Sequence, residues 1–292
     1  MKWPPITEPL LLERLAMDDA TFLAFIGGLW RALPPRRLTP ELLATALSYP
    51  WERPSRSYEL TSERVELLDE VEPGRRRELL DGAPRDPDGA PRYPLLAFGS
   101  NGAPATLARK LAHLPEPERT VLVLAGELHG FDVGAASHPT AYGAMPASLF
   151  ESPGTAVRCA VLWVSAAQFT QLCWTEIGYR LGRLDGVAFA PDQAAEPLGS
   201  VLAYAARLGT FCPDGHPLAL AAIPASGRSA PALTQEELLD RAARLALGEH
   251  ASAATLVRAI FEDVAALDEG GGSTRIRAAG RPFASAAWTP FA

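Results

Sequence analysis

The chain has 292 residues and is acidic, with 34 Asp and Glu against 27 Lys and Arg, and it shows no basic stripe, so we expect no nucleic-acid partner. Its three widely spaced cysteines argue against both a disulfide framework and a zinc site. No apolar run reaches the ~20 residues of a membrane span, and charged residues and prolines interrupt the N-terminus, so we expect a cytoplasmic protein with no membrane partner.

Residues 1–82 are predicted to form a mostly helical N-terminal extension. Asp18-Asp19 is a typical helix start, because a carboxylate there can accept hydrogen bonds from the first free backbone N–H groups. The apolar residues that follow recur at helical spacing and give this helix a broad apolar face. Thr39-Pro40 opens a second helix, with proline at the first helical position.

The extension is predicted to end in two short strands and a loop. Tyr58–Leu60 and Val65–Leu67 alternate between apolar and acidic residues, which favours a β-hairpin; a helix starting at Ser62 is the alternative. Residues 83–93 are rich in Pro and Gly and are predicted to form a linker.

Residues 94–268 are predicted to form the main domain, because they carry most of the strand signals. After the strands, Thr234 and Glu237 form a capping box that opens C-terminal helices. Residues 269–292 begin with a Gly-rich run, have no readable periodicity and are predicted to be a flexible tail. The strands are expected at 94–98, 121–136, 144–151, 156–164, 183–190, 199–209 and 217–223.

Asn101 is the only asparagine of the chain and lies between a predicted strand and a predicted helix. It is informative because the composition is biased: of 27 basic residues only Lys2 and Lys110 are Lys, as in a genome that rarely supplies Asn or Lys. The alternative is a simple Asn-Gly turn. The small-residue loop before the helix is expected to point backbone N–H groups into a concavity that suits a carboxylate or oxyanion. It lacks the motifs of a nucleotide-binding loop.

Residues 165–179 are predicted to contain a short helix that presents Glu176. Ser165 and Gln168 form a capping box, and Gly178 is predicted to end the helix. Glu176 then falls in the last turn, where the helix dipole and apolar neighbours disfavour a charged carboxylate. An easily protonated carboxyl group suits general acid/base catalysis. A surface glutamate without a function is the alternative.

Several segments of the chain resemble those of the γ-glutamylcyclotransferase-like superfamily, in the family's order. The matched stretch covers roughly residues 93–225, under half of the chain. The segments are Phe98-Gly99-Ser100-Asn101, which resembles the Y-G-S-N loop; Leu128–Val133, which resembles L-x-G-F-x-L; Gly143–Gly154, which resembles G-x-A-T-I … P-G; Val157–Trp163, which resembles V-x-G-V-L-W; and the helix ending at Glu176, which matches the segment of the catalytic glutamate.

The resemblance implies an α+β fold: a small mixed β-barrel of the γ-glutamylcyclotransferase-like type, with a mostly helical N-terminal extension and C-terminal helices. It implies an enzyme that releases 5-oxoproline and an amine from a γ-glutamyl compound, by attack of the α-amine on its own γ-carbonyl. Glu176 would shuttle the proton, and Phe98, Gly99, Ser100 and Asn101 would bind the oxyanion or the α-carboxylate. No metal or organic cofactor is implied. The expected partner is a small molecule with a γ-glutamyl or related amide group.

Departures from the family pattern leave the substrate open. Phe98 replaces the usual Tyr and removes a hydroxyl, Gly102 stands where an apolar residue is common, and Ile177 replaces a Gly. One rival hypothesis is a non-catalytic binding protein on the same barrel; the other is an enzyme acting on a different amide or acyl group in a biosynthetic pathway. The histidines are too scattered for a metal site. Further candidates to line a substrate pocket, with core packing as the alternative, are Tyr142, Tyr179 and Tyr204.

Overall fold

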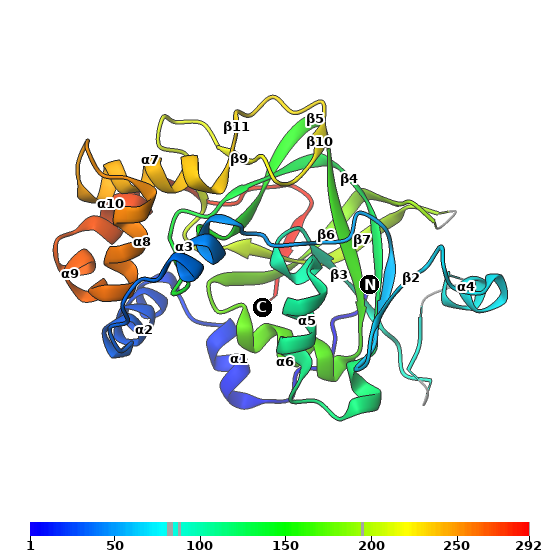
Figure 1. Cartoon of the computed structure of the whole chain (residues 1–292). Helices are drawn as coiled ribbons and strands as arrows, with labels where there is room; N and C mark the ends of the chain where they lie inside the picture. The colour runs from blue at the N-terminus through cyan, green and yellow to red at the C-terminus, as the bar shows by residue number, and fades with distance from the viewer. Residues whose placement is uncertain (81–83, 87–88, 194–195, 292) are drawn as a thin grey trace.

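The centre of the molecule is a closed, mixed barrel of five strands (Figure 1). The ring has the order β5-β3-β7-β6-β4 and closes because β4 also pairs with β5; only β3 and β7 run parallel. The computed structural model, which describes residues 1–80, 84–86, 89–193 and 196–291, thereby confirms the predicted mixed barrel in an α+β fold. The barrel strands are β3 (Tyr93–Ala97), β4 (Val121–Ala135), β5 (Ala147–Val164), β6 (Tyr179–Pro191) and β7 (Leu198–Ala206).

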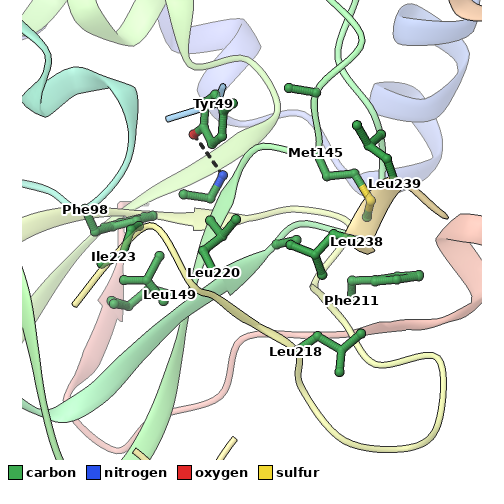
Figure 2. Close-up of a cluster of buried hydrophobic side chains, with 14 of the residues drawn as sticks. Tyr49, Phe98, Met145, Leu149, Phe211, Leu218, Leu220, Ile223, Leu238 and Leu239 are labelled. Carbon is green, nitrogen blue, oxygen red and sulfur yellow. Dashed lines mark hydrogen bonds between the residues drawn. The ribbon is translucent and has the colours of Figure 1, made fainter. Parts of the chain in front are cut away.

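Strand β3 is apolar at every position because both of its faces are buried. Leu95 and Ala97 pack in one hydrophobic cluster with α5 (Pro104–Leu111) and α6 (Ala166–Thr175). Leu96 and the adjacent Phe98 pack in a second cluster, part of which Figure 2 shows. The C-terminal helices that cover this second cluster are α7 (Gln235–Leu247), α8 (Ala253–Glu262), α9 (Val264–Glu269) and α10 (Gly272–Ala278).

Strand β5 is a single element where two strands, 144–151 and 156–164, were predicted. Between the pairs His129↔Ala156 and Phe131↔Glu151, four residues of β5 lie opposite one residue of β4, Gly130. Gly130 and Gly154 both have positive φ (80° and 82°), which only glycine adopts easily. The two predicted strands are therefore one long strand with a bulge between them.

The N-terminal extension contains the predicted helices and the predicted hairpin. Asp18 Oδ1 accepts the Thr21 N–H at 2.7 Å and so caps α2 (Asp19–Ala32). The hairpin strand β1 (Tyr58–Leu60) pairs with β4 as well as with β2, so the extension is joined to the barrel sheet. The remaining elements of the extension are α1 (Pro9–Leu15), α3 (Pro40–Leu47), β2 (Val65–Leu67) and α4 (Pro73–Leu80).

The predicted linker 83–93 lies partly outside the described residues, which exclude 83, 87 and 88. Where it is described, the segment is anchored: Arg92 Nε donates to Asp86 Oδ1 at 2.9 Å and Arg92 Nη1 donates to the Thr120 carbonyl at 3.0 Å. Its last residue, Tyr93, already belongs to β3. No helix among the described residues is long and apolar enough to cross a membrane.

The prediction of a flexible tail at 269–292 is wrong for its described residues, 269–291. After α10, strand β12 (Gly280–Arg281) pairs with β8 (Thr210–Phe211), and β13 (Trp288–Pro290) pairs with β6. The Trp288 ring lies so close to Gly182 that no larger residue fits there. The segment has no periodicity of its own because its partners are distant in sequence. The other short strands are β9 (Ala219–Leu220), β10 (Ala225–Ser226) and β11 (Ala232–Leu233).

Candidate active site

A cavity of about 590 Å³ lies beside the barrel, with walls from α2, α5, the end of α6 and α10. This volume is within the ~300–1,000 Å³ that small-molecule sites usually have. The structure brings every residue predicted for the site to this cavity. They are Phe98, Gly99, Ser100, Asn101, Tyr142, Glu176, Tyr179 and Tyr204.

Glu176 is the residue directly after α6 rather than a member of its last turn. The helix ends at Thr175, and the Glu176 N–H bonds to the Cys173 carbonyl at 3.3 Å. The prediction that Gly178 ends the helix is therefore wrong. Gly178 instead lies against the His138 ring, which would be 3.4 Å from a Cβ at this position.

Glu176, Asn101 and Lys110 form a triangle of contacts. Glu176 Oε1 accepts hydrogen bonds from Asn101 Nδ2 at 3.1 Å and from Lys110 Nζ at 2.5 Å, and Lys110 Nζ also donates to Asn101 Oδ1 at 2.8 Å. The Lys110 and Glu176 side chains are only 12% and 13% exposed. An asparagine amide can donate to a carboxylate and accept from an ammonium at the same time, which an aspartate cannot do. This explains why an asparagine occupies position 101.

Lys110 was not predicted as a site residue. The prediction for Glu176 considered only the helix end and its apolar neighbours, and so it omitted the ammonium group that contacts the carboxylate. Asn101 was singled out because Asn is rare in this chain, and the same argument applies to Lys110, since Lys is almost as rare. A lysine is a compact point charge, whereas the guanidinium fork of the more abundant arginine is wider.

The loop from Gly99 to Gly102 forms a 3₁₀ turn before α5. Inside it, the Gly102 N–H bonds to the Gly99 carbonyl at 3.1 Å and the Ala103 N–H bonds to the Ser100 carbonyl at 3.0 Å. These two N–H groups therefore stabilise the turn and do not face a ligand, contrary to the concavity expected from the sequence. Ser100 and Asn101 line the cavity, and the backbone and hydroxyl of Ser100 form hydrogen bonds with Tyr49.

Tyr49, from the N-terminal extension, holds this loop and was missed by the sequence analysis. Tyr49 Oη accepts the Ala147 N–H at 2.9 Å, the bond drawn dashed in Figure 2. A Cβ at Gly99 would lie 2.8 Å from Tyr49 Oη and 2.9 Å from Ala147 Cβ, so only glycine fits there. Phe98 lies in the apolar cluster with Ile223 and Leu149 (Figure 2).

The tyrosines of the cavity are phenols that stay protonated. Burial raises the pKa of Tyr49, Tyr142, Tyr179 and Tyr204 above its ordinary range. The Tyr179 hydroxyl donates to the Ala147 carbonyl at 2.7 Å. These residues line the cavity and can offer ring surface to a ligand, but they cannot act as bases near neutral pH.

Helix α2 gives the cavity an apolar wall. The apolar face predicted for this helix does not simply fill a core, because several of its side chains line the cavity and are only partly buried. A ligand in the cavity would therefore meet polar groups at the α6 end and apolar surface along α2. The α2 residues concerned are Phe22, Ile26, Leu29, Trp30 and Leu33.

His138 makes the stability of the protein depend on pH. Burial, and secondly the charge of Arg277, lowers the pKa of His138 from 6.5 to about 4. Between these values the unfolded chain binds a proton that the folded protein does not, so the free energy of unfolding should fall as pH drops from 6.5 to 4, by at most about 3 kcal/mol. Urea unfolding of wild type and His138→Gln across this range should show a smaller loss for the variant. Equal losses would contradict this assignment.

No protein-family model matches the chain, and no curated protein matches it either. Among the described residues, no group of three or more His, Cys, Asp or Glu side chains is arranged to hold a metal ion.

Burial raises the pKa of both Cys159 and Cys173 to about 12, so neither is a thiolate nucleophile near neutral pH.

Proposed function

We propose that the protein is a cyclotransferase of the γ-glutamylcyclotransferase-like type, which cleaves the amide of a γ-glutamyl compound and releases 5-oxoproline and an amine. The observation that carries this proposal is the carboxylate of Glu176, held at a cavity by Asn101 and Lys110. Both contacts fall on Oε1, and no group among the described residues donates to Oε2. Oε2 is therefore the oxygen that can accept a proton from a substrate amine.

In this reaction the α-nitrogen of the substrate loses two protons, and the nitrogen of the leaving amine gains two. Glu176 takes a proton from the substrate α-ammonium, and the neutral amine attacks the γ-carbonyl carbon of the same molecule to form the new C–N bond. The ring nitrogen then loses its second proton as the old C–N bond breaks, and the leaving amine takes up the protons. Because nucleophile and carbonyl belong to one molecule, much of the entropic cost of bringing them together is already met.

The groups around Glu176 suit the charges of this reaction. The developing oxyanion on the γ-carbonyl needs donors or positive charge nearby, which the Lys110 ammonium beside Glu176 can supply. The Lys110 charge also offsets that of Glu176 in a place where both are largely shielded from water. The apolar α2 wall would receive the amine half of the substrate.

A non-catalytic binding protein is the second candidate. It is favoured by the same triangle, because the bonds from Asn101 and Lys110 to Oε1 hold Glu176 in one geometry. In that case the triangle would recognise a ligand amine and not deprotonate it.

The test is to incubate the purified protein with γ-glutamyl amino acids and γ-glutamyl amines, measure 5-oxoproline release, and measure binding by calorimetry. Release of 5-oxoproline with turnover is the expected result. Binding without release would favour the binding protein. If there is neither release nor binding, the γ-glutamyl assignment is wrong.

A further inference from the structure

We propose that the second half of α2, residues 27–33, is a lid that opens to admit an apolar ligand to the cavity and closes over it. Helix α2 belongs to the N-terminal extension, outside the stretch that resembles the γ-glutamylcyclotransferase-like family. Leu29, Trp30 and Leu33 of this half line the cavity. The inference rests on the cavity of the proposed function but not on its reaction, because an apolar probe can take the place of the substrate.

Helix α2 is held by few buried side chains. All 14 of its residues are described, and Phe22 alone among them is buried, whereas α8 buries five of its ten residues. Figure 1 shows α2 at the outside of the molecule, where it packs on α9. A helix of this length is only marginally stable without tertiary packing, so the part of α2 after Phe22 can open at low cost.

The chain is fixed on both sides of the lid. Before the lid, Asp19 forms an ion pair with Arg180 at 2.5 Å. After it, the Arg36 N–H bonds to the Phe261 carbonyl at 2.8 Å. Within the described part of the chain, no hydrogen bond or ion pair joins residues 23–35 to another element. The lid can therefore move while the extension stays attached to the barrel and to α8.

Two adjacent glycines, Gly27 and Gly28, lie at the start of the lid, and packing requires neither. A Cβ at Gly28 would meet no atom within 4 Å, and the nearest atom to one at Gly27 belongs to the Arg31 side chain, at 3.7 Å. Alanine would therefore fit at both positions and would strengthen the helix, because glycine loses more backbone freedom on ordering. The two glycines instead leave a point at which the helix can bend.

The surface of the lid suits an apolar ligand. Leu29 and Leu33 are exposed although both line the cavity, and Trp30 is half-buried beside them. Apolar surface in contact with water is unfavourable, so these side chains are stabilised when they close on an apolar group. Closure would also exclude water from Glu176 and Lys110, which strengthens the electrostatic interactions in the cavity.

The test follows the uncharged fluorescent probe N-phenylnaphthylamine as it enters and leaves the full-length protein in a stopped-flow instrument. If the lid must open for both steps, Gly27→Ala/Gly28→Ala should slow association and dissociation by the same factor, about five- to thirtyfold, and leave the Kd unchanged. Gly74→Ala is the matched control, because it replaces a helix glycine in α4, which Figure 1 shows on the side of the molecule opposite to α2. It should change neither rate.

Hydrogen exchange tests whether the probe acts at the lid. In the wild type, the backbone amides of residues 27–33 should exchange faster than those of α8, because less buried surface protects them. Bound N-phenylnaphthylamine should slow exchange at residues 27–33 and leave α4 unchanged. Without the probe, the double variant should slow exchange at residues 27–33 by about the same five- to thirtyfold.

The outcomes separate this inference from the proposed function. Equal slowing of both probe rates would support the lid whether or not 5-oxoproline is released. Unchanged rates in the double variant, or a change in only one of them, would overturn the lid, because the probe would then enter without movement of α2. A probe that does not bind, or that leaves exchange at residues 27–33 unchanged, would overturn it as well. Release of 5-oxoproline with unchanged probe rates would keep the cyclotransferase and reject the lid.

Discussion

Glu176→Gln should lower the rate of 5-oxoproline release about 10²–10⁴-fold, the usual effect of removing a general acid/base. Gln keeps an oxygen that can accept from Asn101 Nδ2 and Lys110 Nζ, so the triangle and the cavity should persist. It cannot take the proton of the substrate ammonium. The rate should be measured at saturating γ-glutamyl substrate, with 5-oxoproline quantified directly.

Two control measurements make this result specific to proton transfer. Thermal unfolding should show a folded variant, and calorimetry should show that it still binds the substrate. A variant that is folded and binds but turns over slowly supports the assignment. If Glu176→Gln retained most of the wild-type rate, Glu176 would not be the proton shuttle.

Gly99→Ala should reduce turnover by about 10²-fold, because a displacement of about 1 Å in a positioned group has effects of that size. The added Cβ would lie 2.8 Å from Tyr49 Oη and 2.9 Å from Ala147 Cβ, both closer than real Cβ contacts. Tyr49 is buried and its hydroxyl is bonded to Ala147, so the loop must move instead. That movement shifts Ser100 and Asn101, which follow directly.

Gly102→Ala is the matched control in the same loop. Its added Cβ would meet the Arg53 Cδ at 3.4 Å, an ordinary contact with a flexible side chain. Turnover and unfolding temperature of both variants should be measured together, and Gly102→Ala should change turnover by less than Gly99→Ala. Equal losses in the two variants would mean that the contact of Gly99 with Tyr49 does not set the loop geometry.

The sequence by itself determined the elements whose stabilising contacts are local. Asp18 accepts from a backbone N–H three residues away, as do Ser165 and Thr234, the latter two within capping boxes. Their effect depends little on the rest of the fold, so the helix starts could be predicted. The buried strands of the barrel could be predicted too, since burial on both faces requires apolar runs. Composition alone identified Asn101 as a candidate site residue, because it is the only asparagine of the chain.

Only the tertiary structure decided how these elements meet. Lys110 and Glu176 are 66 residues apart, and nothing near either one in sequence shows that their charges pair. The Tyr49 hydroxyl reaches Ala147, 98 residues away. Residues 269–291 take their structure from pairing with β6 and β8 and from the packing of Trp288 against Gly182. Local propensity carries no information on such long-range contacts, because they form only when distant segments pack together.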